Sequence, residues 1–130
     1  MMHRWPVRVY YEDTDLAGIV YYANYLRFIE RARTEWIREL GIDQTRLKVE
    51  DGAVFAVRRV EADYLLPAVF DDQLTVLTQV TRMTPARIEL EQKVMRADAL
   101  LFAARVTLAC LGGDMRPRRL PAALAELMRS

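Results

Sequence analysis

The residues best suited to chemistry stand together near the start of the chain. Residues 10–22 read Tyr-Tyr-Glu-Asp-Thr-Asp-Leu-Ala-Gly-Ile-Val-Tyr-Tyr and lead into a segment with helical periodicity. The first turn of a helix presents unpaired N–H groups and the positive end of its dipole, which can bind an anion or polarise a carbonyl. A carboxylate just upstream, such as Asp15, could attack that carbonyl or activate a water against it. Gly18 would let the backbone approach a ligand closely or adopt a positive φ.

Each of these features also has a simpler interpretation. Asp13 and Asp15 could cap the helix or interact with its dipole, and Asn24 is a candidate N-cap. The tyrosines could belong to the core or to an interface. The oxygen ligands of residues 12–15 suit a hard cation such as Mg²⁺ or Ca²⁺. No complete calcium-loop pattern follows them, so we expect no metal site.

Composition excludes several familiar active sites. The chain has 130 residues, with one histidine, His3, one cysteine, Cys110, and one serine, Ser130. A Ser-His-Asp or Cys-His site is not expected, because the only His and the only Ser stand near termini that tend to fray. One cysteine forms no internal disulfide, and the chain cannot supply four ligands to a structural zinc ion. An enzyme built on this chain would use carboxylates, Tyr, Thr, Arg or backbone amides.

Charge and hydropathy limit the partners and the location. The formal net charge is +1, from 19 basic and 18 acidic residues, so no bulk attraction to nucleic acid is implied. The N-terminal residues contain no apolar run typical of a signal peptide. The longest apolar stretch, residues 97–111, is interrupted by Asp98 and Arg105 and is too short to span a bilayer. We expect a cytoplasmic protein that does not insert into membranes.

The elements that must position this segment form one α+β domain over residues 1–130. Apolar residues at three- and four-residue steps predict a helix over Tyr22–Leu40, about 28 Å long. Alternating or apolar runs predict strands, and a short helix ends the chain. One small sheet on one helix leaves edges and a face to cover, so we expect at least a dimer. The expected strands are residues 7–11, 54–66, 74–82, 87–96 and 100–111, and the terminal helix is residues 121–128.

The motifs of this chain and their order resemble those of the hotdog-fold acyl-CoA thioesterases of the 4-hydroxybenzoyl-CoA thioesterase superfamily. The closest resemblance is to the branch associated with the Tol–Pal system (YbgC-like). It covers essentially the whole chain, and its first motif is the most specific. The resemblance implies a long central helix wrapped by a five-stranded antiparallel sheet. The residues that carry it are 9–15, Gly18, 20–21, Tyr25 and 30–35, then Tyr64, Pro67, 71–72 and 115–121.

The resemblance also implies roles for particular residues. Asp15 would be the catalytic carboxylate, as nucleophile or as general base on a water. Tyr22 would supply the backbone N–H that polarises the thioester carbonyl, and Gly18 would shape the same loop. Many members of the branch that this chain resembles have a His at the position of Tyr22. The backbone donor is kept in either case, because every non-proline residue has an N–H. Asp13 would be structural. The residues expected to bind substrate are Arg116, Arg118, Arg87 and Asp63.

The implied function is hydrolysis of an acyl-CoA to free acid and CoA. Alternatives are an acyl-carrier-protein thioesterase, another hotdog enzyme such as a dehydratase, or a non-catalytic acyl-CoA-binding module. No cofactor is implied. The resemblance also implies a homodimer or homotetramer with its sites at the subunit interface, in agreement with the unpartnered sheet.

Overall fold

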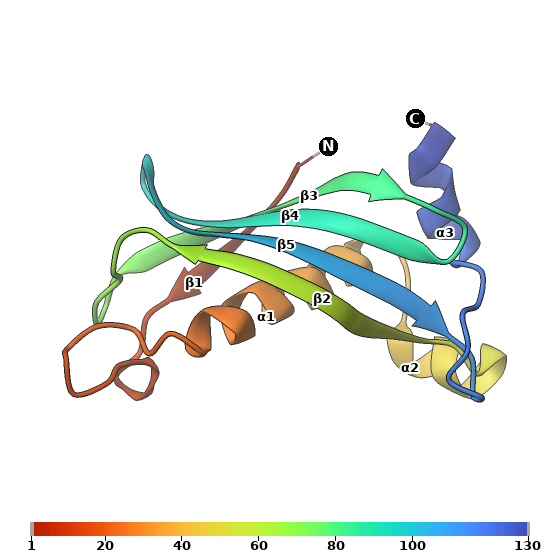
Figure 1. Ribbon diagram of the computed structural model, residues 1–130, viewed down its shortest axis with the longest axis horizontal. Helices are drawn as coiled ribbons and strands as arrows, with labels where there is room; N and C mark the ends of the chain where they lie inside the picture. The colour runs from red at the N-terminus through yellow and green to blue at the C-terminus, as the bar shows by residue number, and fades with distance from the viewer. Residues whose placement is uncertain (1, 130) are drawn as a thin grey trace.

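The computed structural model describes residues 2–129, which form one arched sheet with a helix beneath it (Figure 1). Five strands pair antiparallel in the order β1-β3-β4-β5-β2. The α+β class and the five-stranded antiparallel sheet agree with the prediction. The strands are β1, Met2–Arg8; β2, Val54–Tyr64; β3, Gln73–Met83; β4, Arg87–Arg96; and β5, Ala99–Leu111.

Helix α1, Asn24–Glu39, packs its apolar stripe against the inner face of the sheet (Figure 1). A helix with apolar residues on one face can bury them only against another layer. At about 1.5 Å per residue its 16 residues span about 24 Å, so it is shorter than expected. Tyr22 and Ala23 form a turn before the first helical residue. The stripe consists of Tyr25, Phe28, Ile29, Ala32, Trp36 and Ile37.

Strand β4 shows most clearly how the sequence pattern sets the two faces of the sheet. Its inward residues, Ile88, Leu90, Gln92 and Val94, are fully buried, and Arg87, Glu89, Glu91 and Lys93 alternate with them on the outer face. Side chains alternate between the two faces of a strand, so the predicted period of two is confirmed here. The predicted bounds of β2, β3 and β5 are correct to within two residues.

Strand β1 was predicted in the wrong place. The sequence favours residues 7–11, whereas β1 ends at Arg8 and Tyr11–Asp13 form a short 3-10 turn. β1 lies at one edge of the sheet and pairs only with β3. Its outward residues include Pro6, which has no N–H to donate and is tolerated at an edge. Proline and charged residues in this edge strand interrupt the pattern of apolar residues from which a strand is predicted.

The short helices lie at the end of the sheet away from the N-terminal turn of α1 (Figure 1). Helix α2, Gln44–Arg46, and the π-helical turn Leu47–Asp51 were not predicted. The Asp43 carboxylate caps α2 by accepting hydrogen bonds from two backbone N–H groups, a local signal that the sequence carries. The predicted terminal helix is present, as α3, Ala122–Ala125, followed by the 3-10 turn Glu126–Arg129.

A buried polar cluster joins α1 to the centre of the sheet. The Arg33 guanidinium donates to Gln92 Oε1 at 2.9 Å, and Gln92 Nε2 donates to the Ile29 carbonyl at 3.0 Å and to Thr78 Oγ1 at 2.9 Å. Burial lowers the pKa of Arg33. Gln92 therefore satisfies an otherwise costly buried charge and ties the helix to two strands.

Replacing Gln92 with leucine should lower the free energy of unfolding by about 3 kcal/mol, since a buried guanidinium loses its acceptor. Urea denaturation at one fixed protein concentration measures this change. Gln79→Leu is the matched control, because Gln79 lies exposed on β3 and should change stability by less than about 0.5 kcal/mol. Equal effects of the two substitutions would contradict the role given to the cluster.

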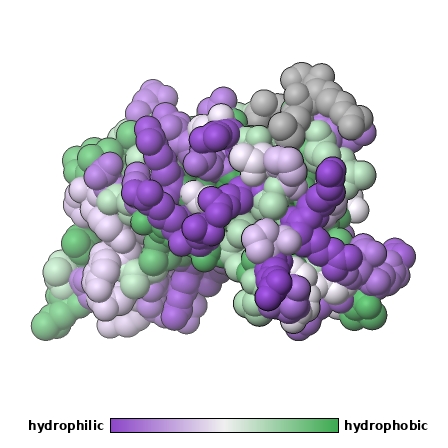
Figure 2. Space-filling view, turned by 45° about the vertical axis from the view of Figure 1, so that its right-hand side comes forward, coloured by the Kyte–Doolittle hydropathy of each residue, from purple (hydrophilic) through white to green (hydrophobic). Residues whose placement is uncertain are grey.

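Exposed apolar side chains gather at the end of the molecule that holds the loop before α1. Figure 2 shows this end at the left as a group of green side chains, beside a largely hydrophilic face. The most exposed is Leu16; the others near it are Ile19, Leu65, Leu66 and Val69. Separately, no helix within residues 2–129 is both long and apolar enough to cross a membrane.

Candidate active site

Asp15 begins a tight turn whose backbone requires glycine. Asp15 Oδ1 accepts a hydrogen bond from the Ala17 N–H at 3.0 Å, and the Asp15 carbonyl accepts one from the Gly18 N–H at 2.9 Å. Gly18 has φ +82°, a conformation that L side chains rarely adopt. The turn leaves the Asp15 carboxylate exposed, and its second oxygen has no partner among residues 2–129. A carboxylate held in this way can act on a ligand.

Asp13 is buried and holds the loop together. Its Oδ1 accepts a hydrogen bond from Asn24 Nδ2 and its Oδ2 accepts one from the Tyr10 N–H, both at 2.8 Å, while its carbonyl accepts one from the Tyr21 N–H at 2.8 Å. The prediction that Asn24 caps the helix is wrong. Asn24 is the first helical residue, its side chain points to Asp13, and the cap residue Ala23 makes no side-chain bond. A long-range bond to a buried carboxylate replaces the expected cap.

Two backbone N–H groups at the start of α1 are available to a ligand. Within residues 2–129, neither the Tyr22 N–H nor the Ala23 N–H has an acceptor. The carbonyls of the same two peptide groups are both held. The Tyr21 carbonyl accepts a hydrogen bond from the Asn24 N–H at 2.8 Å, and the Tyr22 carbonyl accepts one from the Tyr64 hydroxyl at 2.9 Å. The helix start therefore presents two fixed donors at the end of the loop that holds Asp15.

An aromatic cluster packs beneath these donors. Tyr25 stacks on Phe102 with ring centroids 5.0 Å apart, and Tyr64 meets Phe102 edge-on at 5.0 Å and Tyr22 at 6.1 Å. The sequence marks Tyr64 only as a motif match and gives it no role. Its bond to Tyr22 joins residues 42 positions apart, so no local pattern could reveal it.

The connection between β2 and β3 holds the Asp15 turn from the other side. The Ala68 carbonyl accepts a hydrogen bond from the Val20 N–H at 2.9 Å, the Ala68 N–H donates to the Tyr25 hydroxyl at 3.1 Å, and Ile19 bridges to Val69. The Asp15 turn is therefore clamped between α1 and this connection.

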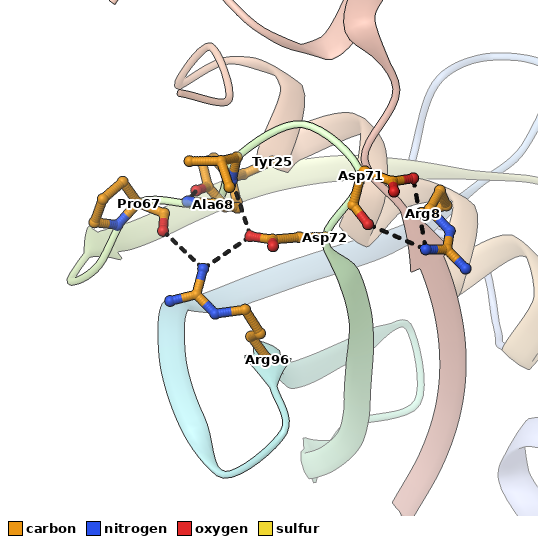
Figure 3. A network of polar contacts seen from close by, with 8 residues as sticks. Arg8, Tyr25, Pro67, Ala68, Asp71, Asp72 and Arg96 are labelled. Atoms are coloured by element: carbon orange, nitrogen blue, oxygen red, sulfur yellow. Dashed lines mark hydrogen bonds and ion pairs between the residues drawn. The ribbon is translucent and has the colours of Figure 1, made fainter. Parts of the chain in front are cut away.

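Charged side chains hold the connection between β2 and β3 in place. Figure 3 shows Arg96 reaching both the Pro67 carbonyl, at 3.2 Å, and the Asp72 carboxylate, at 2.8 Å. On the other side of the same connection, Arg8 donates to the Asp71 carbonyl at 3.1 Å (Figure 3). Asp72 also accepts from the Val69 N–H at 2.9 Å. The two arginines fasten the connection to the strands around it.

Arg87 lies at the other end of the sheet, in a hollow of about 290 Å³ that is rich in arginine. The hollow is also lined by Arg58, Arg59 and Arg82. Arg59 forms an ion pair with Glu61, whereas the other three guanidinium groups have no ion-pair partner among residues 2–129. Three unpaired guanidinium groups in one hollow suit a phosphate or another anion.

Arg116 and Arg118 stand at the same end, after β5. Pro117 bridges to Leu111, the last residue of β5. The Arg116 side chain is exposed, and its carbonyl accepts a hydrogen bond from the Gly112 N–H at 2.9 Å. Arg118 donates to the Asp51 carbonyl. Of these two residues, only Arg116 therefore has a side chain without a partner among residues 2–129.

Asp63 does not join Asp15 within one subunit. It precedes Tyr64 on β2, and consecutive residues of a strand point to opposite faces. Since Tyr64 contacts Tyr22, Asp63 lies on the outer face of the sheet.

The predicted catalytic residues and the predicted substrate-binding arginines lie at opposite ends of one subunit. Tyr64, beside Tyr22, ends β2, whereas Arg87 aligns through Ala109 with the start of β2. Ala56, which pairs with Ala109, and Tyr64 are eight residues apart on β2, or about 26 Å at about 3.3 Å per residue. The structure thus groups Asp15, Gly18 and Tyr22, and separately groups Arg87 with other arginines.

The single histidine and the single cysteine are not placed for nucleophilic catalysis. His3 is buried in β1, contrary to the expectation of a frayed position, and its Nε2 lies 3.1 Å from the Glu39 carboxylate at the far end of α1. Burial raises the pKa of the Cys110 thiol, which disfavours the reactive thiolate. Ser130 lies outside the described residues. Among residues 2–129, no three His, Cys, Asp or Glu side chains form a metal-binding group.

Known sequences are similar to this chain over most of its length. The profile of a family described as the thioesterase-like superfamily matches residues 9–129. An acyl-CoA thioesterase named YbgC from Haemophilus influenzae is 46% identical over 118 residues, which cover 90% of this chain and 87% of that protein.

Solved structures share the fold. A probable thioesterase from Bartonella henselae superposes with a TM-score of 0.89 at 38% identity, covering 93% of this chain and 100% of the other. A 4-hydroxybenzoyl CoA thioesterase variant, crystallised with 4-hydroxybenzoyl CoA, superposes with a TM-score of 0.91 at 24% identity, covering 97% of each chain. At that identity the second likeness concerns the fold alone.

Proposed function

The chain belongs to the thioesterase-like superfamily and is an acyl-CoA thioester hydrolase, and from that premise we propose that Asp15 and the start of α1 carry its reaction. The observation that carries this proposal is one loop that holds both an exposed carboxylate, at its turn, and the unpaired Tyr22 N–H, where it enters α1. Gly18 permits the turn between them.

The proposed reaction uses these groups as follows. The thioester oxygen accepts a hydrogen bond from the Tyr22 N–H, which stabilises negative charge as the carbonyl carbon is attacked. One such donor is worth about 2.7–4 kcal/mol in other acyl-transfer enzymes. Asp15 either attacks the carbon and forms an acyl–aspartate anhydride that water hydrolyses, or removes a proton from the attacking water. In both routes CoA departs as a thiolate, a good leaving group.

The arginine-rich hollow is proposed to bind the phosphates of CoA. Arg58, Arg82 and Arg87 line it without ion-pair partners among residues 2–129, and Arg116 stands nearby at the same end of the sheet. Guanidinium groups bind phosphate through paired N–H donors. Asp63 and Arg118 are weaker candidates for substrate contact, because Asp63 is acidic and Arg118 is already bonded.

We further propose that the active unit is a homodimer joined through the free edges of β2. An antiparallel pairing places the start of one β2 beside the end of its partner. The hollow of one subunit would then approach the Asp15 turn of the other, which would shorten the separation of about 26 Å along β2 within a chain.

The surface near β2 favours this pairing. Val57, Val60 and Tyr64 on β2 are exposed, as are Leu65 and Leu66 beside it. Exposed apolar groups of this extent are typical of an interface. The other sheet edge, β1, carries Pro6 and is unsuited to pairing.

A thiol-release assay tests the proposed substrate class. Short-chain, long-chain and benzoyl CoA esters are supplied separately, and free CoA is measured over time with a thiol reagent. We expect steady release from at least one of these esters. Absence of release from all of them would overturn the function. The cytoplasmic location and the association with the Tol–Pal system stay predictions from the sequence.

A further inference from the structure

We propose that the Tyr64 hydroxyl is a positioning group for the carbonyl-polarising donors at the start of α1. The inference rests on the proposed function of that helix start. It adds Tyr64 to the site and adds the Ala23 N–H as a second donor beside the Tyr22 N–H.

The geometry of two neighbouring peptide groups carries this proposal. A peptide group is planar, with its C=O and N–H pointing in opposite directions. The Tyr21 carbonyl is held by the Asn24 N–H, which fixes the peptide group that contains the Tyr22 N–H. The Tyr22 carbonyl is held by the Tyr64 hydroxyl at 2.9 Å, which fixes the peptide group that contains the Ala23 N–H. Both donors are therefore oriented through their own carbonyls.

The Tyr64 hydroxyl is itself held rigidly. Tyr64 pairs with Phe102 in the ladder between β2 and β5, and its ring packs edge-on against Phe102 and Tyr25. The next residue, Leu65, continues the contact by donating its N–H to the Leu101 carbonyl at 2.8 Å. A hydroxyl on such a fixed ring needs little reorganisation when charge develops on the substrate.

The protonation state of Tyr64 suits a donor. Partial desolvation, together with neighbouring Tyr22 and Tyr25, raises the pKa of the Tyr64 hydroxyl. The hydroxyl therefore stays protonated and can donate to the Tyr22 carbonyl throughout the neutral range. A hydrogen bond accepted by a peptide carbonyl also polarises the N–H of the same peptide group, which strengthens it as a donor.

Tyr64→Phe tests the proposal by removing one oxygen atom. We expect kcat to fall about tenfold, with KM and the thermal midpoint close to those of the wild type, since the ring and its packing remain. The decrease should be similar for short-chain, long-chain and aromatic acyl groups, because all of them share the polarised carbonyl. Tyr11→Phe is the matched control, since the Tyr11 ring is largely exposed and its hydroxyl has no partner among residues 2–129; it should retain the wild-type kcat.

A vibrational measurement separates positioning from a purely structural role. Acyl-CoA labelled with ¹³C at the thioester carbonyl is bound to Asp15→Asn and to Asp15→Asn/Tyr64→Phe, which hydrolyse it slowly. The carbonyl stretch of the bound ester should lie below that of the free ester in the first variant and move back toward it in the second. If kcat and the stretching frequency are both unchanged by Tyr64→Phe, the proposal is wrong. An inactive wild type would instead overturn the proposed function.

Discussion

Asp15→Asn should lower kcat for acyl-CoA hydrolysis by at least about 100-fold while leaving KM nearly unchanged. Asparagine has the shape of aspartate and keeps an oxygen that can accept the Ala17 N–H, so the turn should persist. The substitution removes the negative charge that would attack the carbonyl or take a proton from water. The expected change in rate corresponds to about 2.7 kcal/mol in the activation barrier.

Two further variants sharpen this test. Asp15→Ala should show a similar loss, because it also lacks the carboxylate. Glu12→Gln removes a carboxylate three residues earlier, where the side chain is exposed, and should retain a rate within about twofold of the wild type. Thiol release under saturating substrate measures all three. Near-full activity of Asp15→Ala would show that Asp15 does not carry the chemistry.

The double substitution Arg82→Gln/Arg87→Gln should raise KM for acyl-CoA by at least about tenfold, with little change in kcat. Each guanidinium can supply a charge-assisted hydrogen bond to phosphate, and such bonds are worth about 1.5–3 kcal/mol when formed to charged groups. Both residues line the arginine-rich hollow far from Asp15 in the same subunit. Their loss should therefore weaken binding and leave the chemical step intact.

Substrate truncation provides the control for this second prediction. An acyl-pantetheine thioester has the same reacting carbonyl but lacks the nucleotide and its phosphates. The double variant should hydrolyse it as the wild type does. An equal defect with both substrates would show that these arginines do not bind the phosphates of CoA.

Mixing the two kinds of variant tests whether a site is shared between subunits. A heterodimer of Asp15→Asn with Arg82→Gln/Arg87→Gln contains one site with an intact Asp15 from one chain and an intact hollow from the other. Random reassociation by C₂ symmetry restores about a quarter of the wild-type sites. We expect activity at low substrate to rise to about that fraction after refolding the variants together. No gain over the separately refolded variants would exclude a site formed by both subunits.

The sheet could be predicted well wherever one face of a strand is buried. In β4, full burial of Ile88, Leu90 and Val94 enforces the alternation that the sequence shows. β1 was misplaced because it lies at an edge, where only one neighbouring strand constrains it and Pro6 is tolerated. α2 was missed although Asp43 is a local capping signal, because a helix of three residues leaves no periodicity to detect.

The candidate site was predictable in its local part. Asp15, Gly18 and Tyr22 are close in sequence, and a turn before a helix keeps them close in space. The contact between Tyr64 and Tyr22 was not predictable, since it depends on how β2 passes the start of α1. The capping role predicted for Asn24 failed for the same kind of reason, because buried Asp13 takes its amide.

The predicted substrate-binding residues show a different limit of prediction from the sequence. Arg87 and Arg116 are reasonable ligands for phosphate by residue type, but their position relative to Asp15 depends on the long-range strand pairings of the sheet. A single chain places them at the opposite end of β2 from the turn. In the proposed dimer, pairing through the free edge of β2 would bring these arginines closer to the Asp15 turn of the other subunit.

Pro6 has a consequence for how assembly stops. Joining two chains through β2 makes a sheet of ten strands whose outermost strands are both β1. Each outer strand lacks one N–H at Pro6, so neither can easily template a further chain. An open edge on both sides of the subunit would permit growth into a fibre. In the proposed dimer both β2 edges are paired and both β1 edges carry proline, so assembly would end at two chains.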